Sequence, residues 1–333
     1  SSDLKNIHRK GDLIMKKTVS LILALVLAFS VSGCSENKAE IGNEPVNITM
    51  LKGSTGIGAV KLMEESEKNE ADGNYNINVS AAADDAMAKI ISGEVDIAAV
   101  PTNIAPLIYN KTNGNIAVLA VNTLGVLYIV ENGDSIHTIK DLEGKTIYSS
   151  GQGAVPEYVL NYLLEKNNVE NVNIVYMTEH AEVAAALADG RADIALLPEP
   201  NVTAVIMKNS EIRIAVDVND EWKKTNGSEL AMGCIVAGKE FIDENKEAVD
   251  IFLKEYSESI DYVNNNVSEA AELVEKYGIM ASSDAAVKAI PNCNIVYKEK
   301  DEMKTMLEAF YDVLYKANPK SVGGEIPDTE LYY

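Results

Sequence analysis

Two copies of one phrase decide the fold of this chain. Residues 93–101 read GEVDIAAVP, and residues 190–198 read GRADIALLP. In each copy a glycine follows a helix-like segment, and the apolar run after it ends at a proline. Glycine is suited to the end of a helix, and proline cannot continue a central strand. Each copy therefore predicts a helix end followed by a short buried strand.

Both copies close the same series of predicted elements. We expect strands at 46–51, 76–80, 95–100, 145–150, 172–177, 192–197 and 212–217. The predicted helices are 55–68, 83–92, 157–166, 181–189, 246–264, 268–277 and 301–316. Alternation of this kind predicts mostly parallel sheets covered by helices, in two α/β lobes. Ligands of such sheets bind at the carboxyl ends of the strands, so we expect a cleft between the lobes.

The N-terminal part is typical of an exported protein. Residues 15–34 read MKKTVSLILALVLAFSVSGC, a basic start followed by an uncharged run too short to span a membrane. Its end resembles a bacterial lipobox, in which the cysteine is acylated after cleavage. We expect 15–33 to be a signal peptide, Cys34 to carry lipid including palmitate-type chains, and 34–45 to be a tether. Residues 1–14 are interpreted as leader sequence ahead of a start at Met15.

The composition limits the partners. The chain has 29 basic and 51 acidic residues, a formal charge of −22, and 47% hydrophobic residues. So acidic a surface argues against binding to nucleic acid and against adsorption to anionic lipid bilayers. Attachment to the membrane would therefore depend on the covalent lipid at Cys34. Cys234 and Cys293 could form a disulfide, but buried free thiols are the favoured interpretation.

Three groups of loop residues are the candidate ligand-binding site. A glycine-rich turn that leads into a helix offers free backbone N–H groups to an anion, although it also suits an ordinary helix cap. Such turns occur at 51–58, LKGSTGIG, and at 149–158, SSGQGAVPEY. The third group follows the two repeated strands. The candidates are Lys52, Ser54, Thr55, Thr102, Asn103, Ser150, Gly151, Gln152, Gly153, Glu199 and Asn201.

Glu199 is the candidate with the sharpest alternatives. It stands between two prolines, where it could accept hydrogen bonds from an amine or an aminopyrimidine of a ligand, or instead pair with a lysine near the hinge. Asp96 and Asp193 occupy the same place in the two repeated phrases, and we interpret both as structural. The candidate loops contain no arginine, the usual bidentate partner of a sulfonate.

Several of these features together resemble the substrate-binding lipoproteins of ABC importers. They are the lipobox, DLEGKTI at 141–147, GQGAVPEYVLNYLL at 151–164, GRADIALLPEP at 190–200 and the helical C-terminal part. The chain is most similar to the sulfonate, taurine, nitrate and thiamine-precursor binding group, over residues 46–333. The resemblance implies a type II periplasmic-binding fold, with 46–124 and 233–333 as lobe 1 and 125–232 as lobe 2. The hinge would lie near 122–130 and 228–236.

The resemblance also implies a function. Such receptors close their lobes on a small molecule and deliver it to a membrane permease with a paired ATPase, here as a lipid-anchored monomer on the extracytoplasmic face of the cell membrane. We expect the ligand to be a small oxyanion or a taurine-like zwitterion. A thiamine pyrimidine precursor or similar heterocycle, and a role as a lipid-anchored sensor, remain open.

An enzyme is the opposing class of function. Hydrolysis or group transfer needs a nucleophile, a base and an orienting group. The chain has only three histidines, no GxSxG elbow and no HExxH spacing. One branch of the similar group makes the thiamine pyrimidine from its own histidine beside a cysteine-rich run, which this sequence lacks. We therefore predict no catalytic residues, no metal and no cofactor.

Overall fold

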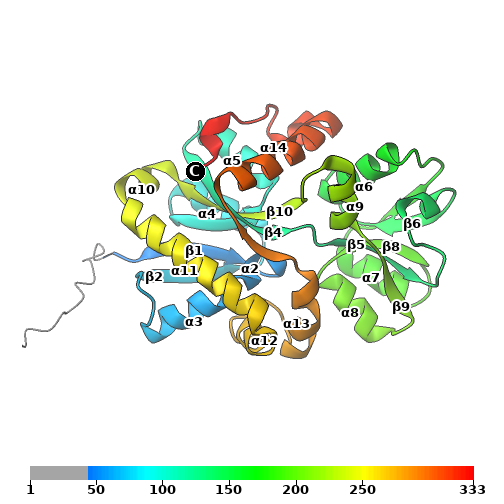
Figure 1. Cartoon of the computed structure of the whole chain (residues 1–333), viewed down its shortest axis with the longest axis horizontal. Helices are drawn as coiled ribbons and strands as arrows, with labels where there is room; N and C mark the ends of the chain where they lie inside the picture. The colour runs from blue at the N-terminus through cyan, green and yellow to red at the C-terminus, as the bar shows by residue number, and fades with distance from the viewer. Residues whose placement is uncertain (1–43) are drawn as a thin grey trace, which may run out of the picture. The chain divides into compact units, whose positions relative to one another are not determined.

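The computed structural model describes residues 44–333, which form one compact unit. The expected leader, signal peptide, lipidated Cys34 and most of the tether lie outside the described residues. Two sheets organise the unit, and Figure 1 shows them side by side with helices packed around each.

The first sheet has six strands in the order β11-β4-β10-β3-β1-β2. We call this sheet and its helices lobe 1. Its strands are β1 (Val46–Leu51), β2 (Tyr75–Ser80), β3 (Ile97–Pro101), β4 (Ile116–Leu124), β10 (Ala231–Gly238) and β11 (Ile295–Lys298). Its helices before the first crossing are α2 (Ser54–Ile57), α3 (Val60–Lys68), α4 (Ala83–Ser92) and α5 (Ile104–Lys111). After the return they are α10 (Lys239–Glu244), α11 (Lys246–Asn265), α12 (Val267–Lys276), α13 (Ser283–Ala289) and α14 (Lys300–Ala317).

The second sheet has five strands in the order β7-β6-β8-β5-β9, and we call it with its helices lobe 2. Its strands are β5 (Leu127–Asn132), β6 (Thr146–Ser149), β7 (Asn173–Tyr176), β8 (Ile194–Pro198) and β9 (Ile212–Asp217). Its helices are α6 (Val155–Lys166), α7 (His180–Ala188), α8 (Asn201–Lys208) and α9 (Val218–Asn226). Short 3-10 turns complete the unit at η1 (Ile139–Leu142), η2 (Ile290–Asn292), η3 (Pro319–Val322) and η4 (Thr329–Leu331).

The repeated phrase forms corresponding elements in the two lobes, as predicted. Gly93 and Gly190 follow α4 and α7 with φ of 72° and 70°, a left-handed conformation that glycine adopts without steric cost. The strands that follow are β3 and β8, and each ends at its proline. The sheets are more mixed than expected, however. β10 pairs antiparallel with β3 and β4, and β5 pairs antiparallel with β8 and β9. The prediction of mostly parallel sheets is therefore wrong.

Two of the antiparallel strands, β5 and β10, directly follow the crossings between lobes, whereas β11 pairs antiparallel with β4 at the edge of the first sheet. The chain leaves lobe 1 along β4, passes Gly125 and Val126, and enters lobe 2 along β5. It returns after α9 through residues 227–230 into β10. Each of β5 and β10 is the first strand after a crossing, and each runs opposite to both strands beside it. The exact lobe boundaries stay a prediction.

The first predicted helix, 55–68, is in fact two helices with a break at Gly58. A Cβ atom on Gly56 would lie 1.8 Å from the carbonyl oxygen of Leu51, and one on Gly58 would lie 2.8 Å from Cγ1 of Ile260. These glycines therefore allow the chain to fold tightly back after β1 and to pack against α11. Part of the glycine content that suggested an anion site has this structural explanation.

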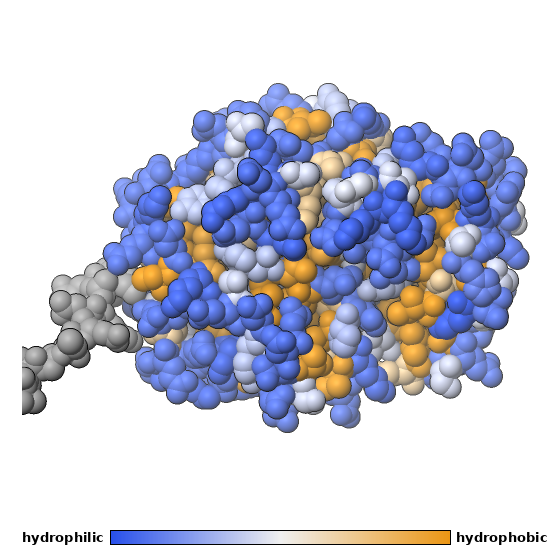
Figure 2. Space-filling view, viewed as in Figure 1, coloured by the Kyte–Doolittle hydropathy of each residue, from blue (hydrophilic) through white to orange (hydrophobic). Residues whose placement is uncertain are grey.

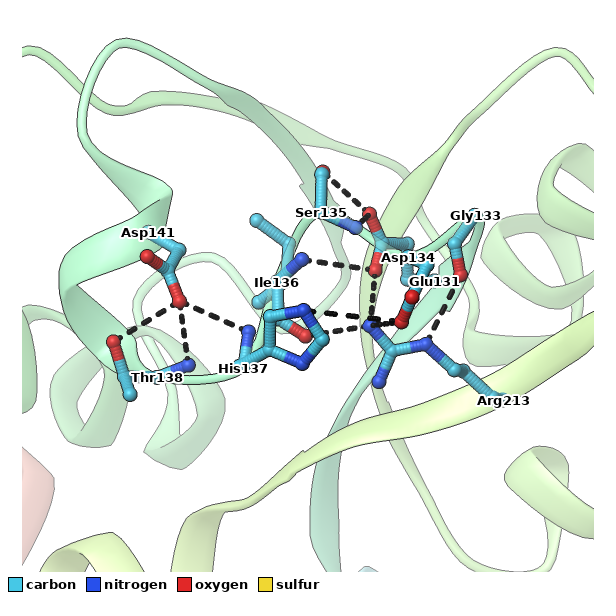
Figure 3. Close-up of polar contacts among 9 residues, drawn as sticks. All are labelled: Glu131, Gly133, Asp134, Ser135, Ile136, His137, Thr138, Asp141 and Arg213. Atoms are coloured by element: carbon cyan, nitrogen blue, oxygen red, sulfur yellow. Dashed lines mark hydrogen bonds and ion pairs between the residues drawn. The ribbon is translucent and has the colours of Figure 1, made fainter.

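An ion pair between a buried carboxylate and a half-buried guanidinium lies at the end of lobe 2 where β5 stops. The carboxylate of Glu131 is 2.8 Å from the guanidinium of Arg213 and accepts from the backbone N–H groups of Ser135 and Ile136 at 2.8 and 3.0 Å. Figure 3 shows these groups converging on the carboxylate. Burial alone would raise the pKa of Glu131, but hydrogen bonds from Ser135 and Ile136 and the charge of Arg213 outweigh it and lower the pKa. The 132–136 connection is thus held to β5 and β9.

The cores are apolar, and the surface is mainly polar. One buried cluster continues from lobe 1 into lobe 2, including Phe310 of α14, Trp222 of α9 and Leu160 of α6. Figure 2 shows a mostly hydrophilic face interrupted by small apolar groups. Within residues 44–333, no helix is long and apolar enough to cross a membrane.

Candidate functional site

Two of the predicted loops meet at the boundary between the lobes. The hydroxyl of Ser54, at the start of α2 in lobe 1, lies 3.5 Å from the carbonyl oxygen of Glu199, which follows β8 in lobe 2. The same hydroxyl is 3.3 Å from Sγ of Cys293. All three residues are buried. The first and third groups of candidates therefore come together in space, from positions 145 residues apart in the chain.

Glu199 forms the centre of this boundary. Its side chain is buried, with 4% exposed, and its carboxylate accepts from N and Oγ1 of Thr203 at 3.1 and 3.0 Å. It also accepts from Nδ2 of Asn292 at 3.2 Å. Burial raises the pKa of Glu199, and these hydrogen bonds only partly oppose the shift. The carboxylate thus holds the first turn of α8 and links lobe 2 to η2 through neutral donors, instead of pairing with a lysine.

Three residues at this boundary were not identified from the sequence. The hydroxyl of Tyr128, at the start of β5, donates to the carbonyl of Asn292 at 2.8 Å. Asn294 donates to the carbonyl of Gly125 at 2.6 Å, at the crossing between lobes. Asn292 and Asn294 flank Cys293 in the stretch PNCNIV, where only the cysteine attracted attention. Asparagine in a loop carries no signal of a long-range contact, so the sequence alone could not have found them.

The glycine-rich turn of lobe 2 is already occupied by a carboxylate. Gly151 and Gly153 both have φ of 74°. The N–H of Gly153 donates to the carboxylate of Glu157, and the hydroxyl of Tyr158 donates to the carbonyl of Gly153 at 2.7 Å. An anionic ligand would have to displace Glu157 to use this N–H group. The predicted anion site at this turn is therefore less free than the sequence suggested.

A pocket of about 710 Å³ opens beside the same turn. It is lined by Gly151, Gln152, Tyr176, Met177, Thr178, Glu182, Ala185 and Arg191. The guanidinium of Arg191 has only a 3.8 Å ion pair with Asp189, and its side chain is 62% exposed. Glu182 accepts from the backbone N–H of Thr178 at 3.0 Å. A pocket that holds both a guanidinium and a carboxylate can bind a small molecule carrying both charges.

Arg191 is a further pocket residue that was not identified from the sequence. It lies inside the repeated phrase GRADIALLP, which was interpreted only as a sign of the fold. The corresponding position of the first copy is Glu94. This difference in charge is the local signal that distinguishes the second copy of the phrase from the first.

Ser150 has a partner that was also not anticipated. Its side chain is 2% exposed, and its hydroxyl is hydrogen-bonded to Nδ1 of His180, the first residue of α7. Burial lowers the pKa of His180, so the imidazole is neutral near pH 7. A hydroxyl and a neutral imidazole at the carboxyl ends of β6 and β7 can offer a ligand hydrogen bonds without charge. Within residues 44–333, the other ring nitrogen of His180 has no hydrogen-bond partner.

The other candidate residues are of two kinds: some are hydrogen-bonded within the protein, and others have side chains that a solute could reach. Thr102 is buried, and its hydroxyl donates to the carbonyl of Ala231 at 2.6 Å, so it joins β3 to β10. The carbonyl of Thr55 accepts from Nδ2 of Asn122 at 2.9 Å. Lys52 is exposed, and Asn103 and Asn201 are half-buried at the starts of α5 and α8. These three residues and Thr55, whose bond uses only its backbone carbonyl, leave their side chains open to a solute.

Other expectations concern residues away from the ligand loops. Asp96 accepts from the backbone N–H of Asn47 at 2.8 Å, which is the structural role proposed for it. Cys234 and Cys293 are buried free thiols. Residues 44–333 hold no cluster of three or more histidine, cysteine or acidic side chains suited to a metal ion.

Comparisons with known proteins agree with this architecture. Residues 114–270 match the family model described as NMT1/THI5 like. A search of curated proteins finds no match. Among solved structures, an ABC transporter protein from Parabacteroides distasonis is similar with a TM-score of 0.75 and 24% identity, over 87% of this chain and 98% of that one.

Two further structures carry ligand names of their own. The periplasmic aliphatic sulphonate binding protein of Escherichia coli is similar with a TM-score of 0.70 and 17% identity, over 88% of this chain and 92% of that one. The periplasmic nitrate-binding protein of Synechocystis PCC 6803 has a TM-score of 0.59 and 13% identity, over 86% and 83%. The chain has the type II periplasmic-binding fold. The predicted resemblance to this group of binding proteins is thereby confirmed.

Proposed function

We propose that this chain is the solute-binding receptor of an ABC importer. It captures a small molecule by lobe closure and delivers it to a membrane permease with a paired ATPase. One observation carries the proposal: two α/β lobes meet at their strand-end loops, where Ser54 of one lobe contacts Glu199 of the other. Similarity of fold to named sulfonate and nitrate receptors supports it. No catalytic step is part of the proposed function.

The ligand that we propose first is a small zwitterion of the taurine type or a small oxyanion. The pocket lined by Gln152, Glu182 and Arg191 lies wholly within lobe 2 and supplies an amide and both signs of charge. Arg191 would hold the acidic group through its guanidinium, and Glu182 would accept from the amine. A nitrogen heterocycle without negative charge, such as a thiamine pyrimidine precursor, is the second candidate. It is favoured by the Glu157 carboxylate, which already occupies the N–H of Gly153.

A thermal-shift panel tests the receptor. The protein from residue 40 onward is heated with taurine, alkanesulfonates, nitrate, aminopyrimidines, thiamine and amino acids, after refolding to remove any carried-over solute. A compound at 100 times its dissociation constant stabilises the fold by about 2.7 kcal/mol, which raises the midpoint by roughly a few degrees. A shift with one chemical class is expected. The absence of any shift across small solutes of all these classes would contradict the proposal.

Two charge-removing variants then separate the ligand classes. With a zwitterion, both Arg191→Gln and Glu182→Gln weaken binding, because each removes the partner of one charge. With a simple oxyanion only Arg191→Gln weakens it, and with an aminopyrimidine only Glu182→Gln does. Lys140→Gln is the matched control, since Lys140 is exposed and does not line this pocket. Equal affinity of all three variants would place the ligand elsewhere.

The attachment to the membrane is a separate proposal. We propose that Cys34 carries the lipid and that the receptor is a monomer on the extracytoplasmic face of the cell membrane. The lipobox-like sequence VSGC at 31–34 supports lipidation of Cys34. Because the chain is strongly acidic, the covalent lipid would be its main means of attachment to an anionic membrane. The substitution Cys34→Ala should move the protein from the membrane fraction to the soluble fraction, which cell fractionation measures. Retention of the variant in the membrane would contradict the proposal.

A further inference from the structure

The C-terminal helix α14 contacts both lobes. It packs against β4 and β10 of lobe 1 and against α6 of lobe 2. The ring of Phe310 in α14 meets that of Trp222 in α9 edge-on, with centroids 5.9 Å apart, and Trp222 is fully buried. Figure 1 shows α14 reaching from lobe 1 toward α6 and α9. We call this contact the α14 seam.

A short chain of hydrogen bonds runs from the α14 seam to the glycine-rich turn of lobe 2. Nδ2 of Asn318, the residue that ends α14, donates to the hydroxyl of Tyr158 in α6 at 3.0 Å. The hydroxyl of Tyr158 donates in turn to the carbonyl of Gly153 at 2.7 Å. Both donor–acceptor distances lie within the normal range for hydrogen bonds. Two side chains therefore connect lobe 1 to the turn at 151–153.

Asn318 is itself held to lobe 1. Its Oδ1 accepts from the backbone N–H of Lys320 at 3.1 Å and so caps η3. The η3 turn is held in place by Nδ2 of Asn110 in α5, which donates to the carbonyl of Val322 at 3.3 Å. A rotation of lobe 2 away from lobe 1 would thus stretch the bond between Asn318 and Tyr158, because Asn318 cannot follow.

The turn depends on its outside contacts for its shape. Gly151 and Gly153 both lie in the left-handed region, and the turn has one internal backbone bond, from N of Ala154 to O of Gly151 at 3.0 Å. Glycine loses more conformational freedom on ordering than other residues, so a turn of this kind is loose without external bonds. Glu157 and Tyr158 supply those bonds from the first turn of α6.

We propose that Asn318 is a positioning residue for the turn at 151–153 and acts on it through Tyr158. When the α14 seam is closed, the chain Asn318–Tyr158–Gly153 holds the turn in one conformation, and when the seam opens the turn relaxes. The meaning of this coupling for ligand capture rests on the proposed function, in which the turn lines the ligand pocket. By thermodynamic linkage, a solute that needs the ordered turn then also favours the closed seam.

Hydrogen exchange of the turn tests the coupling without any ligand. Asn318→Asp keeps the oxygen that caps η3 but removes the N–H donated to Tyr158, and Tyr158→Phe removes both bonds of the chain. Since one hydrogen bond is worth about 1 kcal/mol, each variant should speed exchange of the Gly153 and Ala154 amides by about two- to tenfold. The double variant should exchange no faster than Tyr158→Phe alone.

The control is strand β9 of the same lobe, at 212–217. A merely structural role for Asn318 would raise exchange in β9 as much as in the turn, and that result would overturn the proposal. Unchanged exchange of the turn in Asn318→Asp would also overturn it, as would additive effects in the double variant. Because the measurement needs no solute, its failure is distinct from a failure of the thermal-shift panel, which tests the receptor itself.

Discussion

Lobe 2 contains two buried glutamates in opposite electrostatic situations. Glu131 at the end of β5 and Glu199 after β8 are 3% and 4% exposed, so burial is almost the same for both. At Glu131 the hydrogen bonds from Ser135 and Ile136, together with the charge of Arg213, outweigh burial and lower the pKa. Glu199 takes hydrogen bonds from Thr203 and Asn292 alone, and its pKa is raised.

Burial raises the pKa at both positions, and the partners decide whether that rise is overcome: they outweigh it at Glu131 and only partly oppose it at Glu199. The end of lobe 2 away from lobe 1 has a complete ion pair and serves stability. The end that meets lobe 1 has a buried carboxylate without a cation. This arrangement lowers the stability of the fold. Ionisable groups with shifts of this kind collect at functional sites, although structural networks also produce them. Glu199 lies between the lobes, where such a cost is compatible with movement.

Removal of the cation from the first pair should have the largest effect. Arg213→Met leaves Glu131 buried without its countercharge, and we expect a loss of about 3 kcal/mol in the free energy of unfolding. Urea denaturation at pH 7 measures it. Arg191→Met is the matched control, because Arg191 is mostly exposed with one long ion pair, and it should change stability little. Equal losses of stability in the two variants would show that the ion pair of Glu131 with Arg213 contributes no more than an exposed one.

Removal of the second carboxylate should cost less. Glu199→Ala leaves the N–H of Thr203 and the amide of Asn292 without an acceptor, for which we expect a loss of about 1–3 kcal/mol. Glu199→Gln keeps one acceptor and should lose less than Glu199→Ala. A double-mutant cycle of Glu199→Ala with Asn292→Ala, followed by denaturation, should show coupling between the lobes. Strict additivity would mean that the bond across the boundary contributes nothing.

The two glutamates should respond to pH with opposite sign. The pKa of Glu131 lies below its ordinary 4.5, so its contribution is present above that pH and is lost as the pH falls further. The pKa of Glu199 lies above 4.5, so its contribution is complete below that value and is lost as the pH rises through the shifted pKa. Glu199→Gln should therefore flatten the stability profile above pH 4.5. An unchanged profile in this variant would contradict the assignment.

The smallest effect is expected for the hydroxyl of Tyr128. Tyr128→Phe removes the bond to the carbonyl of Asn292 and leaves the ring in place, so a loss of about 1 kcal/mol is expected. Differential scanning calorimetry at pH 5 and pH 7 measures it and should give similar losses, because a phenol is protonated at both and burial raises the pKa of Tyr128 further. A loss that depends strongly on pH would show that Tyr128 is coupled to Glu199.

The fold was largely predictable from the sequence, because the repeated phrase carries local signals. Glycine after a helix and proline after an apolar run placed β3 and β8 correctly, and the approach of Ser54 to Glu199 follows from strand ends facing one cleft. Antiparallel β10 was not predictable, since its direction depends on the crossing between lobes.

The site was less predictable than the fold. Arg191, His180 and Asn292 enter it through tertiary contacts that no local spacing encodes. The stretch that contains α13, η2 and β11 was left without an interpretation, although it supplies the lobe 1 partner of Glu199. The glycines of 51–58 were assigned mainly to a ligand, whereas close packing against Leu51 and Ile260 accounts for two of them.

One residue of the α14 seam has a practical consequence. Trp222 is the single tryptophan of the sequence, and it lies between Tyr162 of α6 and Phe310 of α14. Within residues 44–333, its indole N–H has no hydrogen-bond partner. Water that enters when the lobes part would bond to this group and shift the emission to longer wavelength. The molecule therefore contains its own fluorescent reporter of lobe opening, which needs neither a label nor knowledge of the solute.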